Sequence, residues 1–270
     1  MVKKLKGAFL VLTNKCNLRC KYCYQGSSPN VNTKNELKKE EWKKILLQLK
    51  GLKAKKLSFV GGEPFLYKDF WNILEFAKKK GFEIKIFTNG TFLNEKVLKK
   101  LKKLNIKLSF NLNSHNKKFQ DFFQEKGSWE ETVNAIEQCK KQKIEFEIAS
   151  PIMKGNLRNL DKFIKFCTKL GAKRIRLVPL ILMGNAVNLK RFKISKKQIK
   201  KLNKKIKNRG IKVTVGCRVC EAGINYITIQ PNGDVNPCSI NQVKLGNIKN
   251  SSLKEILKSQ TRGYAKVCAV

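Results

Sequence analysis

Apolar residues along the chain recur in two alternating patterns, one typical of β-strands and the other of α-helices. Short apolar, β-prone runs predict strands at 8–13, 56–60, 83–88, 106–111, 144–149, 173–178 and 211–215. The segments between them repeat apolar residues every three or four positions, which predicts helices at 37–50, 68–80, 94–103, 129–142, 157–170 and 195–208. The first of these helices carries Leu37, Trp42, Ile45, Leu46 and Leu49 on one side.

Strands that alternate with helices of about ten or more residues are typical of βαβ units and a parallel sheet. Six such units over about 210 residues predict an α/β fold of the partial (β/α)6 type, like an incomplete TIM barrel. A flat doubly wound sheet is the alternative, and in both architectures the functional site lies at the carboxyl ends of the strands. Polar or Gly-rich residues follow nearly every predicted strand, so we expect them to share one rim. They are the cysteine loop, Gly61 to Pro64, Thr88 to Gly90, Asn111 with Asn113, Ser150 and Pro179.

From residue 216 the alternation of strands and helices stops. The segment ITIQPNGDVNPC predicts a β-hairpin, because an Asn-Gly turn separates two short β-prone runs. A short helix is predicted at 251–258. We therefore expect a core domain at 1–215 and a small cysteine-rich β-hairpin and helix domain at 216–270.

The charge of the chain is strongly positive, with 59 Lys and Arg against 19 Asp and Glu and a net charge of +40. Most of the cations are Lys and are spread over every helical stretch, whereas Arg is the better residue for bidentate phosphate contacts. We interpret them as solvated helix faces, and a nucleic-acid partner is the alternative. No apolar run is long enough to span a membrane, and the apolar run near the N-terminus is too short for a signal peptide. We expect a cytoplasmic protein with no membrane partner.

Nine cysteines without a secretory signal favour metal binding over disulfides. Cys16, Cys20 and Cys23 follow the first predicted strand on one short loop. Three thiolates can hold a four-iron cluster and leave one iron open to another ligand. Zinc is the alternative, but structural zinc wants four ligands, and the single histidine, His115, is far away in the sequence.

This loop resembles the Cys-x-x-x-Cys-x-aromatic-Cys signature of the radical S-adenosylmethionine (radical SAM) superfamily, with Tyr22 at the aromatic position. Gly61-Gly62-Glu63-Pro64 resembles the GGEP motif of that family, which binds the amino group of S-adenosylmethionine. Thr88-Asn89-Gly90 also matches, whereas 108–116 has Asn111 and Asn113 where relatives often carry an Asp. The resemblance implies a [4Fe–4S] cluster on the three cysteines and reductive cleavage of S-adenosylmethionine. It also implies a 5′-deoxyadenosyl radical that takes hydrogen from a substrate.

A second group of cysteines lies in the C-terminal region. Cys220, twelve residues, Gly233, four residues and Cys238 resemble the SPASM or twitch domains appended to many relatives. The segments at 246–248 and 252–253 also fit that resemblance. It implies an auxiliary [4Fe–4S] cluster held by Cys217, Cys220, Cys238 and Cys268. A zinc site made of the same four thiolates is the alternative.

The resemblance and the shared rim together give the expected cofactor site. Its residues are Tyr22, Gly61, Gly62, Glu63, Pro64, Thr88, Asn89, Asn111, Asn113 and Ser150. By the same resemblance the substrate is a peptide or protein side chain, with a small molecule of molybdopterin-precursor or haem biosynthesis as the alternative. A reductant such as flavodoxin or ferredoxin is the implied electron donor. We expect His115 to have a loop role, and Cys139 and Cys167 to be buried structural residues.

Overall fold

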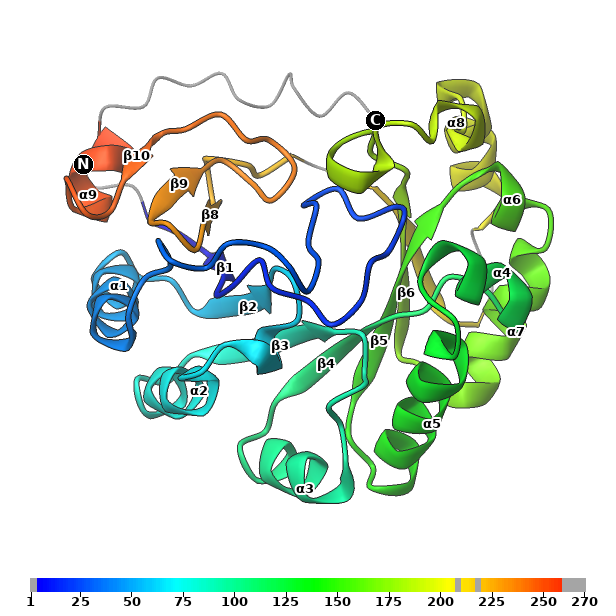
Figure 1. Cartoon of the computed structure of the whole chain (residues 1–270), viewed down its shortest axis with the longest axis horizontal. Helices are drawn as coiled ribbons and strands as arrows, with labels where there is room; N and C mark the ends of the chain where they lie inside the picture. The colour runs from blue at the N-terminus through cyan, green and yellow to red at the C-terminus, as the bar shows by residue number, and fades with distance from the viewer. Residues whose placement is uncertain (1–3, 207–209, 217–219, 259–270) are drawn as a thin grey trace. The chain divides into compact units, whose positions relative to one another are not determined.

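The computed structural model describes residues 4–206, 210–216 and 220–258, and its contacts divide them into two units. The first unit contains residues 4–16, 30–86 and 220–258. The second contains residues 17–29, 87–206 and 210–216. The chain passes between them directly after Cys16, so Cys20 and Cys23 belong to the second unit. Both units are built on parallel strands (Figure 1).

The first unit combines an early and a late part of the chain. Its strands lie in the order β10-β9-β8-β1-β2-β3, in which β8, β1, β2 and β3 run parallel and the β8–β9 and β9–β10 pairs are antiparallel. The strands are β1 Gly7–Val11, β2 Lys56–Val60, β3 Glu83–Thr88, β8 Tyr226–Ile229, β9 Asp234–Asn236 and β10 Gly246–Asn247. The last two residues of β3 belong to the second unit. The helices are α1 Lys39–Gly51, η1 Pro64–Leu66, α2 Phe70–Lys79 and α9 Leu253–Lys258.

The apolar stripe predicted for the first helix is the buried face of α1. Trp42, Ile45, Leu46 and Leu49 are all at most 1% exposed, as their spacing requires. Helix α1 packs against α2 and α9, and Figure 1 shows α1 and α2 next to each other. Phe70 of α2 meets the β2 strand through an edge contact with a phenylalanine ring, which seats the helix on the sheet.

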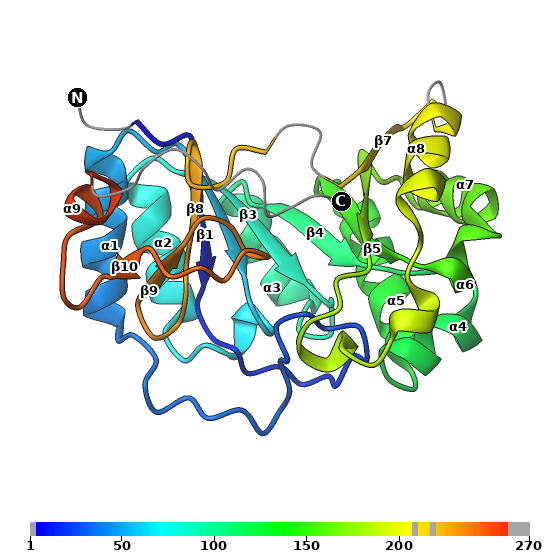
Figure 2. The same cartoon turned by 90° about the horizontal axis from the view of Figure 1, so that it is seen from above.

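The second unit has four parallel strands in the order β4-β5-β6-β7. These strands are β4 Lys107–Asn111, β5 Phe146–Ile152, β6 Arg174–Pro179 and β7 Lys212–Val215. Its helices are α3 Glu95–Lys103, α4 Lys117–Phe123, α5 Ser128–Lys141, α6 Lys154–Leu157, α7 Leu160–Leu170, η2 Gly184–Ala186, η3 Lys190–Phe192 and α8 Lys196–Lys205. Helix α5 packs against α7 (Figure 2). Trp129 of α5 stacks on Phe166 of α7 with 5.9 Å between ring centroids.

Most predicted elements are present within a few residues of their expected bounds. The strands at 56–60 and 83–88 coincide with β2 and β3, and the predicted hairpin is the β8–β9 pair. The helix predicted at 157–170 corresponds to α7, Leu160–Leu170. The short helices α4 and α6 were not predicted. No helix in the described ranges is both long enough and apolar enough to cross a bilayer.

Candidate functional site

In the first unit, the turn after β2 is fastened to the residues directly before Cys16. The Gly62 N–H donates to the Thr13 carbonyl at 2.9 Å, and the Glu63 N–H donates to the Lys15 carbonyl at 2.9 Å. A Cβ atom on Gly62 would lie only 2.1 Å from the Lys15 carbonyl oxygen. Because no side chain fits there, the glycine permits the close approach of two backbones. Cys16 follows this contact and is 8% exposed.

Gly61 and Glu63 complete this turn. Gly61 has φ of +126°, a region that favours glycine, and a Cβ there would lie 2.4 Å from the Thr13 carbonyl oxygen. The Glu63 side chain is fully buried and accepts a hydrogen bond from the Phe65 N–H at 3.4 Å, where it caps the short helix η1 that Pro64 begins. The turn therefore places one buried carboxylate beside the segment that leads to the first cysteine.

A third residue, Glu36, supports the same segment and was not predicted. Its carboxylate accepts from the Thr13 hydroxyl at 2.7 Å and from the Asn14 N–H at 3.2 Å. Burial raises the pKa of Glu36 above its usual range, although these hydrogen bonds favour the ionised carboxylate. Its position in a polar stretch before α1 gave no sequence signal for this contact.

In the second unit, the Cys20–Cys23 segment is held through its backbone carbonyls. The Cys20 carbonyl accepts from the Cys23 N–H at 3.1 Å and from the Asn185 side-chain amide at 3.2 Å. The Cys23 carbonyl accepts from the Gly26 N–H at 3.2 Å and from the Asn185 N–H at 2.9 Å. These contacts involve backbone carbonyls, and neither cysteine forms a disulfide.

The loop after β6 therefore holds the cysteine loop in place, and Gly184 allows the backbones of these two loops to come close together. Gly184 has φ of +55°, and a Cβ there would lie 2.6 to 2.7 Å from the Gly26 nitrogen and from the Cys23 and Tyr24 carbonyl oxygens. Sequence reasoning missed this clamp, although the Gly184-Asn185 pair after a strand is a turn signal that could have drawn attention to it.

Tyr22, the aromatic residue of the cysteine loop, is 8% exposed and meets three amide side chains. Its hydroxyl accepts from the Asn113 amide at 2.7 Å and lies 2.7 Å from Asn111 Oδ1 and 3.1 Å from Gln124 Oε1. Burial raises the pKa of Tyr22 well above its usual value, so the hydroxyl keeps its proton. Gln124 comes from the sequence directly after α4, the helix that the sequence did not predict.

Asn111 and Asn113 thus contact the cysteine loop, and Asn113 is held in turn by α4. Its backbone N–H donates to the Gln120 side chain at 2.9 Å, and its carbonyl accepts from the Asn156 amide at 3.1 Å. Among the described residues the Asn113 Oδ1 atom is buried without a hydrogen-bond partner. Ser150 lies in β5 and is 1% exposed.

Strand β3 ends at Thr88, and the next residue, Asn89, forms a second polar contact with the cysteine loop. The Asn89 amide donates to Asn17 Oδ1 at 2.9 Å, and the Asn17 amide donates to the Thr91 hydroxyl at 3.0 Å. The Thr88 hydroxyl accepts from the Gly90 N–H at 3.0 Å, which shapes the turn. Asn17 was not predicted as a site residue, although it lies inside the cysteine motif.

Cys220 and Cys238 lie on either side of the C-terminal β8–β9 hairpin, and both are partly exposed and form no disulfide. Cys217 and Cys268 lie outside the described residues. The Asn241 N–H points at the Cys238 sulfur from 3.1 Å, a contact of the kind that tunes iron–sulfur clusters. Gly233 supplies the φ of +90° needed in the hairpin turn, and Asn247 donates to Asp234 at 2.7 Å to fasten that turn.

The donor chemistry of these positions fits iron–sulfur clusters. Within the described ranges no three His, Cys, Asp or Glu side chains are already gathered as a metal site. The five candidate cysteines in those ranges form no disulfide, and thiolate is the ligand that iron–sulfur clusters take. They are Cys16, Cys20, Cys23, Cys220 and Cys238.

The remaining candidates lie in packing positions. Cys139 in α5 and Cys167 in α7 are fully buried, as predicted. Burial raises the pKa of Cys139 to about 12 and that of Cys167 further still, so both stay neutral thiols. His115 lies in the loop after β4, where burial and nearby Lys162 lower its pKa.

Comparison with known proteins adds relatives of two kinds. Fe-coproporphyrin III synthase of Methanosarcina barkeri is 27% identical to this chain. The match covers 64% of this chain and 43% of that protein. The antilisterial bacteriocin subtilosin biosynthesis protein AlbA of Bacillus subtilis is 27% identical over 92% of this chain and 58% of its own length. The chain therefore spans less than two thirds of either relative.

A solved structure supports the fold. Streptococcus suis SuiB bound to its precursor peptide SuiA superimposes with a TM-score of 0.81 at 18% identity, over 94% of this chain and 65% of SuiB. At that identity the likeness concerns the fold alone, and it confirms the predicted α/β fold class.

Matches to two known families show the family to which this chain belongs. Residues 220–266 match the SPASM iron–sulfur cluster-binding domain, which confirms the predicted kind of C-terminal domain and its cofactor class. Residues 10–167, from β1 into α7, match the radical SAM superfamily. Because that match covers more than half of the chain, this protein belongs to the radical SAM superfamily.

Proposed function

We propose that this chain cleaves S-adenosylmethionine reductively and removes a hydrogen atom from a peptide or protein side chain. The observation that carries the proposal is the pair of hydrogen bonds that fasten Gly62 and Glu63 to the segment leading into Cys16. It brings the sequence expected to bind the amino acid end of S-adenosylmethionine next to the first expected cluster ligand. The predicted organisation, a core at 1–215 and an auxiliary cluster domain at 216–270, is part of the same proposal.

Cys16, Cys20 and Cys23 would hold the [4Fe–4S] cluster. When bound, that cluster supplies the electron that splits S-adenosylmethionine into methionine and a 5′-deoxyadenosyl radical. The clamp of Asn185 on the Cys20 and Cys23 carbonyls would keep two of the ligands in place when the cluster changes charge.

The buried Glu63 carboxylate would accept the ammonium group of S-adenosylmethionine, a charge-assisted hydrogen bond in a site that excludes water. Gly61 and Gly62 would keep the backbone close to that end of the cofactor, and Pro64 would fix its direction. The other proposed contacts lie at the carboxyl ends of β3, β4 and β5 and in the cysteine loop. They come from Tyr22, Thr88, Asn89, Asn111, Asn113 and Ser150.

For the auxiliary cluster we propose Cys217, Cys220, Cys238 and Cys268 as ligands. Cys220 and Cys238 flank the β8–β9 hairpin, so a cluster held there would sit on a fixed element rather than on a long loop. The N–H of Asn241 would hydrogen-bond the cluster-bound sulfur of Cys238 and raise its reduction potential. Electrons would come from a small reductant such as flavodoxin or ferredoxin.

The peptide substrate is supported by AlbA, whose name assigns it to the biosynthesis of a bacteriocin, and which matches nearly the whole of this chain. A second candidate substrate is a porphyrin, favoured by the likeness to Fe-coproporphyrin III synthase. Binding of the two candidate substrates can be told apart by absorption, because an iron porphyrin absorbs strongly in the visible range and a peptide does not.

The test is reductive cleavage under anaerobic conditions. The reconstituted protein is mixed with dithionite and S-adenosylmethionine, and 5′-deoxyadenosine is measured by chromatography. We expect Cys16→Ala, Cys20→Ala and Cys23→Ala each to abolish its formation, and the buried Cys139→Ala to serve as the matched control that retains it. Deoxyadenosine at wild-type rates from the three loop variants would refute the proposal, as would a chain that binds about one zinc and no iron.

A further inference from the structure

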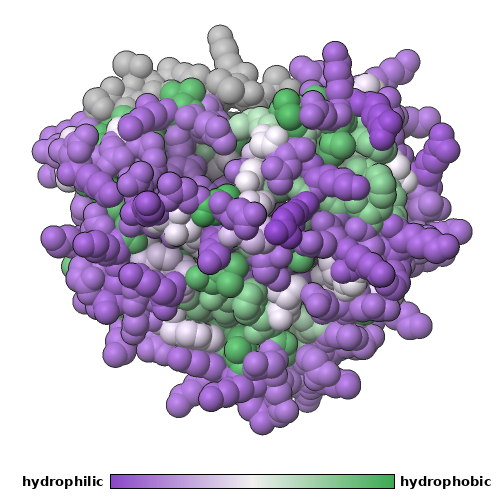
Figure 3. All heavy atoms as spheres, viewed as in Figure 1, coloured by the Kyte–Doolittle hydropathy of each residue, from purple (hydrophilic) through white to green (hydrophobic). Residues whose placement is uncertain are grey.

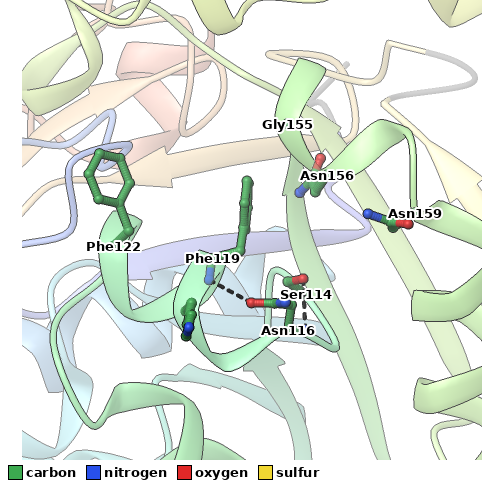
Figure 4. Close-up of a pocket in the computed structure, with 8 residues that line it drawn as sticks. Ser114, Asn116, Phe119, Phe122, Gly155, Asn156 and Asn159 are labelled. Carbon is green, nitrogen blue, oxygen red and sulfur yellow. Dashed lines mark hydrogen bonds between the residues drawn. The ribbon is translucent and has the colours of Figure 1, made fainter.

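A surface groove in the second unit has not been assigned a role. It consists of two hollows of 420 and 460 Å³ that share Gly155 as a lining residue. Figure 4 shows the first hollow, with Phe119 and Phe122 from α4 on one side and Gly155 and Asn156 on the other. The second hollow continues along α6 to Arg191 and Phe192. A Cβ on Gly155 would lie 2.6 Å from the Phe119 ring, so the glycine leaves the junction open.

The groove is continuous with the apolar cluster beneath the cysteine loop. Phe119 and Phe192 pack against the same buried cluster as Tyr22 and Phe123, and Cys20 packs against it too. The ring centroids of Phe119 and Phe123 are 4.9 Å apart, and those of Phe123 and Phe192 are 5.1 Å apart. A ligand in the groove would therefore contact the rings that support one of the proposed cluster ligands.

The charges of the groove are of one sign. Its lining includes Lys118, Lys154, Arg158 and Arg191 and contains no Asp or Glu. None of these four cations forms an ion pair with a carboxylate in the part of the chain that the structure describes. By contrast, Lys117 on the same helix as Lys118 pairs with Asp121 at 2.9 Å. Figure 3 shows that hydrophilic side chains cover most of one face of the molecule.

Two amide side chains of the groove, those of Asn116 and Asn156, already form hydrogen bonds within the protein. Asn116 accepts from the Phe119 N–H at 3.0 Å, and Asn156 donates to two carbonyls and accepts from the Met153 N–H at 2.9 Å. The groups left for a ligand include phenylalanine rings and cations. Phe122 is 54% exposed, yet Lys21 lies over its ring at 3.6 Å, and Arg191 lies over the Phe192 ring at 4.8 Å.

From this geometry we infer that the groove binds an acidic segment of the substrate peptide, in which carboxylates alternate with apolar side chains. The inference rests on the proposed function and names the class of peptide. The carboxylates pair with Arg158, Arg191 and Lys154, and an apolar side chain enters the hollow beside Phe119. A single-stranded nucleic acid fits less well, because its bases need free aromatic faces and cations cover one face of Phe122 and one of Phe192.

The test measures binding rather than turnover. A fluorescein-labelled peptide, Gly-Glu-Leu-Glu repeated three times, is titrated with the reconstituted full chain, and the Kd is read from fluorescence anisotropy. The neutral counterpart, Gly-Gln-Leu-Gln repeated three times, controls for the carboxylates. Arg158→Glu with Arg191→Glu is the test variant. Lys96→Glu with Lys103→Glu changes the net charge equally on exposed positions of α3 and is the matched control.

We expect the double arginine variant to weaken binding of the acidic peptide roughly tenfold or more, and the lysine control to weaken it by less than about threefold. The neutral peptide should bind the wild-type chain roughly tenfold more weakly than the acidic one. Equal weakening by both variants, or equal binding of both peptides, would overturn the assignment. So would a 12-nucleotide RNA that binds more tightly than the acidic peptide with the same dependence on the arginines.

This experiment stands apart from the test of the proposed function. Deoxyadenosine formation by the wild-type chain without peptide decides the proposed function alone. Loss of groove binding in a chain that forms deoxyadenosine would remove only the peptide assignment.

Discussion

Removing the Tyr22 hydroxyl tests whether the buried amide network holds the cysteine loop. Tyr22→Phe keeps the ring in its apolar cluster and deletes only the oxygen that meets Asn111, Asn113 and Gln124. Asn113 is fully buried, so its amide N–H would lose its 2.7 Å partner without access to water. A buried donor left unpaired costs about 1–3 kcal/mol.

The neighbours of Asn113 and Asn111 place the expected loss of stability within this range of about 1–3 kcal/mol. The Asn113 amide also lies 3.4 Å from Gln124 Oε1, which can take over part of the lost hydrogen bond, while Asn111 is partly exposed and can reach water. We therefore expect a loss of about 2 kcal/mol, near the middle of the range. For a unit of this size it corresponds to a fall in Tm of roughly 4–8 °C.

The assay is thermal denaturation of the reconstituted protein under anaerobic conditions, with iron content measured in the same samples. Tyr67→Phe is the control, because it makes the same chemical change in the first unit, where the hydroxyl donates a single 2.7 Å hydrogen bond to the Leu37 carbonyl. We expect Tyr67→Phe to cost about 1 kcal/mol. If Tyr22→Phe lowers the Tm no more than Tyr67→Phe does, the network contributes nothing beyond an ordinary hydrogen bond and the reasoning is wrong.

Three further predictions concern the clamp, the hairpin turn and the second cluster. Gly184→Ala should lower the free energy of unfolding by about 2 kcal/mol and lower the iron content, because the added Cβ would meet three backbone atoms of the cysteine loop at a residue with positive φ. An unchanged iron content and Tm would contradict the proposed clamp. Burial opposes ionisation of Asp234, yet Lys244 and two amides hold its pKa below the usual range. Its stabilisation is therefore present above about pH 4 and lost as the pH falls through the lowered pKa, and Asp234→Asn should flatten this acid dependence in thermal unfolding. Cys220→Ala with Cys238→Ala should reduce iron from about eight to about four atoms per chain, measured by metal analysis; iron that stays at the wild-type level would exclude these two ligands.

The sequence predicted the strands and long helices because their apolar periodicity is set locally. The stripe of Trp42, Ile45, Leu46 and Leu49 needs only a nearby sheet to bury it, and such patterns survive in any α/β fold. The cysteine loop and the GGEP turn were found for a different reason, since both consist of rare residues at fixed spacing.

Contacts made across long sequence separations were not predictable in the same way. Asn185 reaches the Cys20 carbonyl across 165 residues, and nothing in its local sequence distinguishes it from other turn asparagines. Helix α4 was missed because Phe119, Phe122 and Phe123 give no clear helical stripe over seven residues. Its buried face is defined by Tyr22 and the apolar cluster, which only the folded chain brings together.

The pairing of β8 with β1 affects the order in which the chain can fold during synthesis. One edge of β1 receives β2 early, but the other is covered only when Tyr226–Ile229 has been made, about 170 residues after the end of β2. At ribosomal speeds of about 5–20 residues per second, that edge stays open for roughly 10–30 s. During this interval β1, which leads directly to Cys16, is an unprotected edge strand that can pair with another chain. The SPASM hairpin therefore also ends the period in which the nascent first unit is prone to aggregate.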